Sequence, residues 1–163
     1  PIMVFREWHR HRTQSYNELS ARYTPLPDIN YRPTKERVVS GATIQSKNKQ
    51  AVGIMPLTEE FVEDWLKTLN EAYEKAERTY QIGLALGIPK ELARLCIPVG
   101  RYSRMRASAN LRNWLEFLTL RLTLDTQWET RQYANAVGEL VKQTFPRTWK
   151  LFAVNNIPNP PGT

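Results

Sequence analysis

The sequence of 163 residues has few side chains that could form a disulfide bond or bind a metal ion. It contains one cysteine, Cys96, and two histidines, His9 and His11. One cysteine excludes an intrachain disulfide framework and indicates a reducing, cytoplasmic location. The two histidines are two positions apart, and on a helix such residues point in nearly opposite directions. We therefore expect no structural zinc and no other metal.

Long apolar segments are also lacking. No run approaches the roughly 20 apolar residues that a helix needs to cross a bilayer, so we expect no membrane anchor and no signal peptide. Hydrophobic residues nevertheless make up 41% of the chain, which excludes a wholly disordered protein. The length fits one domain, which we assign to residues 1–152, followed by a C-terminal tail over residues 153–163.

The net charge is strongly positive, at +7. It predicts an anionic partner, which could be a nucleic acid, an acidic lipid or a phosphorylated small molecule. One hypothesis is a basic helical module that binds nucleic acid, because the chain interleaves cations with aromatic rings. The residues concerned are Arg101, Tyr102, Arg104, Arg106 and Trp114.

The first part of the chain reads as two helices separated by a loop. A short N-terminal helix is expected to end at the cationic residues 10–12, and residues 13–56 form a polar loop interrupted by prolines. Thr58 suits the N-cap of a long helix that stops at Gly87. The residues expected on its buried face, which could also contact another subunit, are Phe61, Trp65, Leu69, Tyr73 and Tyr80.

The second part of the chain predicts further helices and one strand. A short helix over residues 90–95 precedes a strand over residues 101–107, and a last helix covers residues 126–145. Between them Asn110 opens a helix with an apolar face. The residues expected to be buried there are Leu111, Trp114, Leu115, Leu118 and Leu122.

Residues 10–23 concentrate arginines, hydroxyl groups and an amide in a stretch without periodicity. Guanidinium groups combined with short donors suit a phosphate-binding loop. A generic basic surface loop has the same composition, so the residues alone leave both interpretations open. Cys96 lies between Leu95 and Ile97, which predicts an inert thiol in the core.

The same stretch resembles the signature of flavin-dependent thymidylate synthases: Arg-His-Arg, then seven residues, then serine. Here these residues are Arg10, His11, Arg12 and Ser20. A second block agrees in order and type over residues 93–129, with Asn110-Leu111-Arg112 at its centre. The resemblance implies an α+β fold, helix-rich, with a small mixed or antiparallel sheet, assembled as a homotetramer with shared sites. Members of the family carry a segment before this signature, and we expect that this sequence lacks it.

The resemblance also implies the residues of the site. Those implied to bind dUMP are Glu7, Arg10, Glu18, Leu19, Ser20, Ala21, Arg22 and Arg94. Those implied to bind FAD are Arg10, His11, Arg12, Glu18, Asn110, Leu111, Arg112 and Glu116. Glu116 stands where the family usually has Asn or His, and its carboxylate would repel anionic cofactor groups unless it pairs with Arg112.

Arg121 is the implied catalytic residue, beside N3 of the uracil ring, where a guanidinium stabilises negative charge and activates C5. Ser20 is implied to bind phosphate and not to act as a nucleophile. The implied reaction is the reductive methylation of dUMP to dTMP, with methylenetetrahydrofolate as the one-carbon donor and NADPH-reduced FAD as the hydride carrier. The partners would be the small molecules and the chain itself, without nucleic acid or membrane. Two alternatives are the nucleic-acid-binding module and a catalytically inactive fragment of the same fold.

Overall fold

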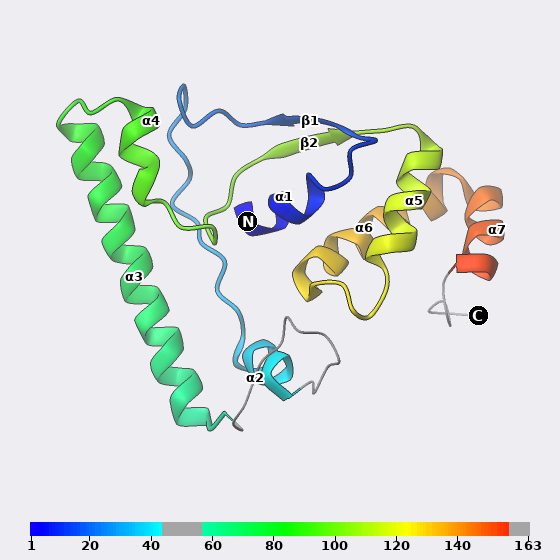
Figure 1. Ribbon diagram of the computed structural model, residues 1–163, viewed down its shortest axis with the longest axis horizontal. Helices are drawn as coiled ribbons and strands as arrows, with labels where there is room; N and C mark the ends of the chain where they lie inside the picture. Colours follow the sequence, from blue (N-terminus) through cyan, green and yellow to red (C-terminus); the bar gives the residue numbers. More distant parts are fainter. Residues whose placement is uncertain (44–56, 157–163) are drawn as a thin grey trace. The chain divides into compact units, whose positions relative to one another are not determined.

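The computed structural model describes residues 1–43 and 57–156 (Figure 1). In chain order the elements are α1 (Ile2–Trp8), β1 (Ser15–Glu18), α2 (Lys35–Thr43), α3 (Glu59–Ala85), α4 (Lys90–Ala93), the 3-10 helix η1 (Arg94–Cys96), β2 (Met105–Ser108), α5 (Leu111–Arg121), α6 (Trp128–Thr144) and α7 (Pro146–Asn156). β1 and β2 pair in a two-stranded antiparallel sheet. Helices with one small sheet confirm the predicted α+β, helix-rich fold class.

The chain forms two compact units. The first unit contains residues 1–3 and 18–104, and the second contains residues 4–17 and those from 105 onward. Each unit combines stretches that are far apart in the sequence, so contacts between distant segments build its core.

In the first unit, α3 begins and ends as the sequence predicts. The Thr58 hydroxyl accepts a hydrogen bond from the main-chain N–H of Phe61 at 3.3 Å, and Glu59 and Glu60 place negative charge in the first turn. After the helix, Gly87 adopts a φ of 74°, a conformation that glycine accepts without strain. Both local signals are therefore confirmed.

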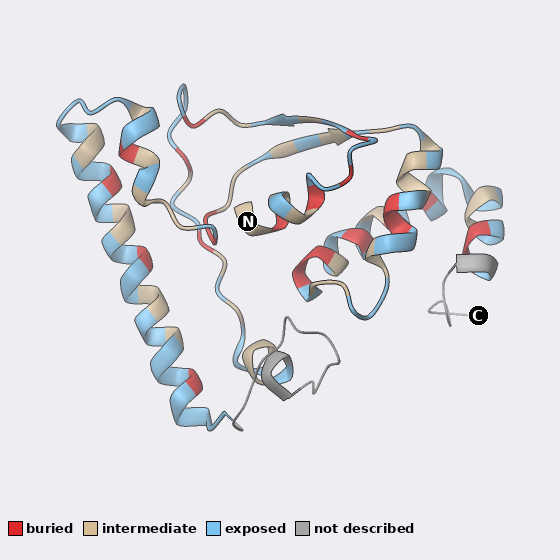
Figure 2. Ribbon diagram, in the orientation of Figure 1, coloured by how far each residue is buried: buried red, intermediate tan, exposed pale blue. Residues whose placement is uncertain are grey.

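The buried face of α3 agrees only in part with the predicted stripe, in which Tyr73 and Tyr80 are confirmed as buried. Figure 2 shows the buried positions of α3 spaced along one side of the helix, and they are Val62, Tyr73 and Tyr80. Their spacings of 11 and 7 residues each return to within about 20° on an α-helix, so they form one narrow row. Phe61 and Trp65, which we predicted to be buried, are 60% and 48% exposed.

The prediction of a continuous loop over residues 13–56 is partly wrong, because β1 and α2 lie within it. β1 is polar and mostly exposed, so it has no apolar alternation, and it is ordered by pairing with β2. α2 starts after Thr34, whose hydroxyl accepts from the main-chain N–H of Arg37 at 3.2 Å. Residues 44–56 of the predicted loop lie outside the described residues.

The second unit packs around Trp8 of α1 and Phe117 of α5. Their rings stack with centroids 4.6 Å apart, and Trp114 meets Trp8 edge to face at 6.3 Å. Phe117 and Leu118 are 0% exposed, whereas the sequence predicted Leu118 but not Phe117 in the core. The other predicted core residues of α5 are only half-buried: Leu111, Trp114, Leu115 and Leu122.

The remaining differences concern element ends. β2 covers Met105–Ser108 and not residues 101–107, because Arg101 instead forms an isolated bridge with Asn30. The predicted helix over residues 126–145 is present as α6, but α7 was not predicted. α7 begins at Pro146, directly after the C-cap of α6, where a proline suits the first turn of a helix. Residues 157–163 of the predicted tail lie outside the described residues.

Candidate functional site

In the second unit the structure brings together Arg121, His11 and Glu7. Arg121 is the last residue of α5, and its Nε donates a hydrogen bond to Nε2 of His11 at 2.8 Å. Its Nη2 donates to the main-chain carbonyl of Glu7 at 3.2 Å, and its Nη1 lies 3.6 Å from the Glu7 carboxylate. The predicted catalytic arginine is therefore held in place by two other predicted site residues, and its side chain is only 18% exposed.

His11 is buried, with 9% of its surface exposed. An arginine side chain can only donate hydrogen bonds, so His11 Nε2 must be unprotonated and the ring proton must lie on Nδ1. Burial is the main cause that lowers the pKa of His11, and the positive charge of Arg121 lowers it further, against the carboxylates of Glu116 and Glu7. The His11 ring also meets Phe117 edge to face at 4.8 Å.

Glu7 lies between two guanidinium groups. One of its carboxylate oxygens is 3.6 Å from Arg121, and the other is 3.7 Å from Nη1 of Arg10 on the next turn. Arg10 has a side chain that is 68% exposed, so it is accessible to a ligand. The Glu7 carboxylate therefore lies near one enclosed arginine, Arg121, and one exposed arginine, Arg10.

In the first unit the predicted phosphate-binding residues form a tight turn. The carbonyl of Ser20 accepts from the main-chain N–H groups of Tyr23 and Thr24, both at 3.1 Å, and Ala21 is buried. Arg22 pairs with Glu91 of α4 at 2.7 Å. These contacts fix the turn as a compact loop with the Arg22 side chain at its surface.

The helix that holds this turn leads directly to another predicted site residue. Lys90 donates to the carbonyl of Tyr23 at 3.0 Å, and α4 continues into η1, which begins at Arg94. The structure thus places Arg22 and Arg94 on connected segments. The sequence analysis did not select Lys90 or Glu91, because no signature includes them. They touch the turn only in the folded chain, Lys90 through the Tyr23 carbonyl and Glu91 through Arg22.

Asn110 and its neighbours occupy the start of α5. The Asn110 side chain caps the helix by accepting from the N–H of Asn113 at 2.9 Å, and Asn113 donates to the Thr13 carbonyl at 2.9 Å. Arg112 and Glu116 are exposed, and the ion pair that would neutralise Glu116 is not formed between these two described side chains.

Other predicted residues occupy exposed or connecting positions. Arg12 is exposed, Glu18 is the last residue of β1, and the N–H of Leu19 donates to the Arg104 carbonyl at 2.8 Å. Leu111 is half-buried at the start of α5. The predicted site residues thus fall into two sets, one in each unit.

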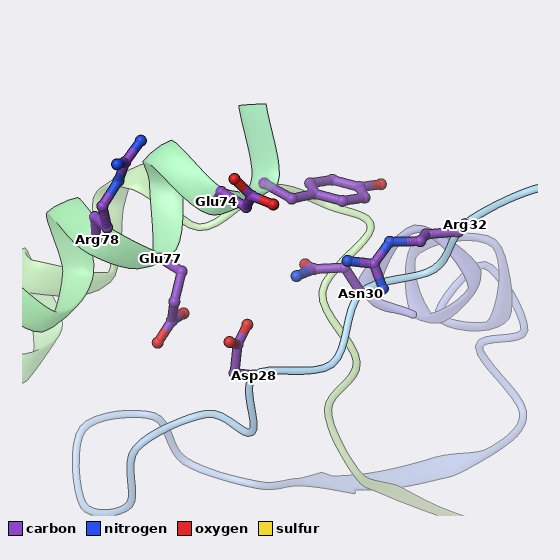
Figure 3. Close-up of a pocket in the computed structure, with 7 residues that line it drawn as sticks. Asp28, Asn30, Arg32, Glu74, Glu77 and Arg78 are labelled. Atoms are coloured by element: carbon purple, nitrogen blue, oxygen red, sulfur yellow. The ribbon is translucent and has the colours of Figure 1, made fainter. Parts of the chain in front are cut away.

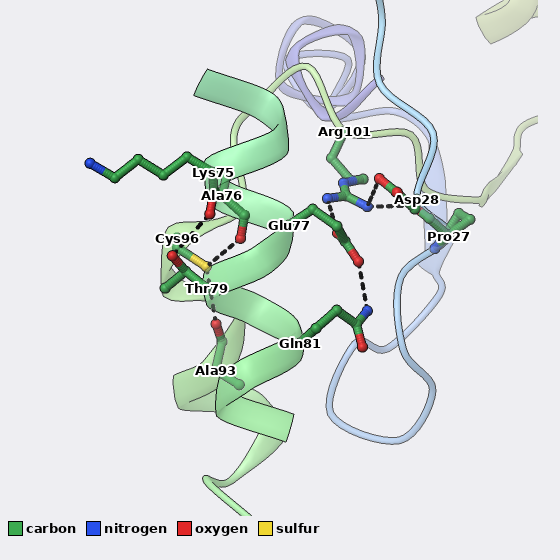
Figure 4. Close-up of polar contacts among 10 residues, drawn as sticks. All are labelled: Pro27, Asp28, Lys75, Ala76, Glu77, Thr79, Gln81, Ala93, Cys96 and Arg101. Carbon is green, nitrogen blue, oxygen red and sulfur yellow. Dashed lines mark hydrogen bonds and ion pairs between the residues drawn. The ribbon is translucent and has the colours of Figure 1, made fainter. Parts of the chain in front are cut away.

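Arg101, which we considered as a nucleic-acid contact, is a structural residue. It is 0% exposed and donates to Glu77 at 2.5 Å, to the Pro27 carbonyl at 2.8 Å and to Asp28 at 3.2 Å (Figure 4). A guanidinium that is enclosed and paired in this way cannot contact a nucleic acid. Arg101 therefore does not support the hypothesis of a nucleic-acid-binding module.

Cys96 lies in the same unit and is half-buried, so it is less enclosed than predicted. Its thiol donates to the carbonyls of Ala76 and Ala93 at 3.3 and 3.4 Å (Figure 4). These contacts are weak hydrogen bonds to main chain and give the thiol no activating base.

A separate cavity of about 310 Å³ opens in the first unit. Figure 3 shows polar side chains around it, namely those of Asp28, Asn30, Arg32, Glu74, Glu77 and Arg78, and Tyr73 completes the lining. None of the predicted site residues lines this cavity. Within residues 1–43 and 57–156, no group of three or more His, Cys, Asp or Glu side chains could hold a metal ion.

The comparisons with known proteins agree with the family that the signature indicates. The family model described as thymidylate synthase complementing protein matches residues 1–147. A flavin-dependent thymidylate synthase of Thermus thermophilus is 39% identical over 152 residues, which are 93% of this chain and 53% of that protein. One from Pseudothermotoga lettingae is 36% identical over 152 residues, covering 93% of this chain and 62% of that protein. The chain therefore spans about half to three-fifths of the length of these curated relatives.

A solved structure is similar over almost the whole chain. It is a UMP/dUMP methylase, PolB, from Streptomyces cacaoi bound with 5-Br UMP, with a TM-score of 0.83 and 30% identity over 98% of this chain and 73% of that one. No helix in the described part of the chain is long and apolar enough to cross a membrane. The match of the family model over residues 1–147 establishes that the chain belongs to the thymidylate synthase complementing protein family.

Proposed function

We propose that this chain carries the activity of a flavin-dependent thymidylate synthase, the reductive methylation of dUMP to dTMP. The observation that carries the proposal is the enclosed Arg121, whose guanidinium is held by His11 and Glu7. A guanidinium beside N3 of a uracil ring stabilises negative charge there, which raises the electron density at C5, the carbon to be methylated. Because Arg121 is mostly shielded from water, its charge acts more strongly than that of an exposed arginine.

The nucleotide phosphate would bind at the turn of the first unit. Ser20, Ala21 and Arg22 supply a hydroxyl, main-chain N–H groups and a guanidinium, and Arg94 adds a second cation from η1. The resemblance adds Arg10, Glu18, Leu19 and Glu7 to the residues proposed to bind dUMP, with Glu7 on the pyrimidine side. A phosphate dianion would compete with Glu91 for Arg22.

FAD fits the cations of the second unit. Arg10, Arg12 and Arg112 are exposed there, and three guanidinium groups suit the pyrophosphate of this cofactor. The resemblance also assigns Asn110, Leu111, His11, Glu18 and Glu116 to the binding of FAD. When bound, the flavin would supply the hydride that reduces the transferred one-carbon unit, with NADPH and methylenetetrahydrofolate as co-substrates.

We also propose that the sites are completed by self-association into a homotetramer. Several large apolar side chains of the first unit are exposed, as expected of surfaces that pack against another subunit. They include Ile82, Leu86, Leu92 and Leu95, which are 59%, 74%, 52% and 80% exposed. Light scattering on the purified chain tests this, because a monomer at micromolar concentration would contradict it. A cytoplasmic location is proposed from the free thiol of Cys96.

The experiment is an assay of dTMP formation by the purified chain with FAD, dUMP, methylenetetrahydrofolate and NADPH. UMP is assayed in parallel, because the methylase that resembles this chain is described as acting on UMP and dUMP. Arg121→Met should abolish turnover, whereas Arg147→Met, at an exposed position of α7, should not change it. A folded wild-type chain that binds FAD but forms no methylated nucleotide would overturn the proposal and favour the inactive-fragment alternative.

A further inference from the structure

The Arg121 guanidinium is held more firmly on one edge than on the other. Its Nε donates to His11 Nε2 at 2.8 Å, and its Nη2 donates to the Glu7 carbonyl at 3.2 Å. Its Nη1 lies 3.6 Å from the Glu7 carboxylate, too far for a hydrogen bond. The first two partners are a buried ring and helical main chain, whereas the third is the end of a flexible side chain.

We infer that His11 is the positioning residue for Arg121, holding the Nε edge of its guanidinium so that a pyrimidine base can replace the Glu7 carboxylate at the opposite edge. The identity of the base rests on the proposed function. The holding contact does not, because both of its partners are residues of this chain.

The Glu7 carboxylate can leave Arg121 at small cost. Its side chain is 32% exposed, and its second oxygen already lies 3.7 Å from Arg10, so it keeps a cation when it turns away. A uracil ring ionised at N3 offers two adjacent acceptors, O2 and N3. These match the two N–H groups that point the same way from Nη1 and Nη2 of a guanidinium.

His11 can serve this role only while it is neutral. A protonated imidazole donates from both nitrogens and would turn an N–H toward the Nε–H of Arg121. The charged groups that face the ring are Arg121 and Glu116 from α5 and Glu7 from α1. From β1, the Tyr16 hydroxyl donates to the His11 carbonyl at 2.7 Å and fixes its backbone.

Two substitutions separate positioning from packing. His11→Phe keeps an aromatic ring against Phe117, which the imidazole meets at 4.8 Å, but removes the acceptor. His11→Gln keeps an acceptor that does not titrate but removes the ring. A role in packing alone predicts that the phenylalanine variant is the more active one, whereas positioning of Arg121 predicts the reverse.

The kinetic test measures kcat and KM for dUMP across the pH range in which histidine titrates. Loss of a hydrogen bond to a charged group corresponds to about a 10- to 100-fold change, which we expect in kcat for His11→Phe, with KM within about threefold of wild type. His11→Gln should retain more of the wild-type kcat than His11→Phe does, and it should lack the fall in kcat at acid pH that we expect of the wild type. Equal losses in both variants would overturn the inference.

A second measurement needs neither flavin nor substrate. In the nitrogen-15 spectrum of the full chain, the Arg121 Nε–H signal, assigned by its loss in Arg121→Met, should shift and exchange faster with water in His11→Phe. In the wild type it should also move as His11 is protonated, and in His11→Gln it should not. If the wild type makes no dTMP but these shifts occur, the proposed function fails and the positioning role stands. A signal that His11→Phe leaves unchanged refutes the positioning role whatever the activity.

Discussion

Arg101 and Glu77 form a buried ion pair in the first unit, with Nη2 of the arginine 2.5 Å from a carboxylate oxygen of the glutamate. The Arg101 side chain is 0% exposed and that of Glu77 is 15% exposed, so neither charge is well solvated. Gln81 donates to the other Glu77 oxygen at 2.6 Å. The pair joins α3 to the segment before β2. Arg101 also donates to the carbonyl of Pro27, which connects a third segment of the chain.

We predict that Glu77→Ala destabilises the chain strongly, because it leaves the Arg101 charge buried without its closest partner. Breaking a buried pair in this way costs about 3–5 kcal/mol in the free energy of unfolding. Urea denaturation followed by circular dichroism measures the change. Asp28→Asn is the matched control, since the Asp28 side chain is 62% exposed and its loss should cost less than about 1 kcal/mol. Similar losses of unfolding free energy in Glu77→Ala and Asp28→Asn would contradict the prediction that Glu77 is the more important partner of Arg101.

Gly100 should not tolerate a side chain. A Cβ at this position would overlap the Tyr73 hydroxyl and lie 3.0 Å from the ring carbon that bears it. Gly100→Ala should therefore cost about 1–3 kcal/mol of unfolding free energy, because it displaces the hydroxyl from the Tyr31 carbonyl that it now contacts at 3.0 Å. Tyr73→Phe in the same background should recover part of this loss. If the effects of Gly100→Ala and Tyr73→Phe on the unfolding free energy are simply additive, the added methyl group does not clash with the Tyr73 hydroxyl, and this explanation is wrong.

The stability of the second unit should fall in acid through His11. Because the pKa of His11 is lowered on folding from its ordinary value of 6.5, the unfolded chain binds the proton first as the pH falls. The contribution to stability is complete above pH 6.5 and is lost as the pH drops from there through the lower pKa of the folded state. Urea midpoints measured against pH should show this slope in the wild type and a smaller one in His11→Gln. If the urea midpoint depends on pH equally in the wild type and in His11→Gln, groups other than His11 cause the loss of stability in acid.

Glu91 should weaken the binding of the nucleotide phosphate. It pairs with Arg22 at 2.7 Å, and both side chains are about half exposed, so a phosphate would have to displace a weak ion pair and approach a carboxylate. Glu91→Gln should lower the Kd for dUMP by about two- to fivefold, whereas Arg22→Met should raise it. Titration calorimetry with dUMP checks both directions. A weaker affinity in Glu91→Gln would instead indicate that Glu91 orients Arg22 for the phosphate.

The sequence by itself determined the features that depend on neighbouring residues. Thr58 and Asn110 each cap a helix through a residue three positions later, and Gly87 ends α3 through its own backbone conformation. The signature beginning at Arg10 likewise sufficed to indicate the family, because its residues are defined by spacing along the chain. Local hydrogen bonds and fixed spacings are readable without knowledge of the fold.

Only the tertiary structure decided which residues meet across the chain. The hydrogen bond between His11 and Arg121 joins positions 110 residues apart, and β1 is a strand because β2 lies beside it. Arg101 looked like a surface cation until partners from two other segments enclosed it. Burial of a charge depends on the groups that distant segments bring to it, since an unpaired charge would not be stable there. No local pattern in the sequence encodes those partners.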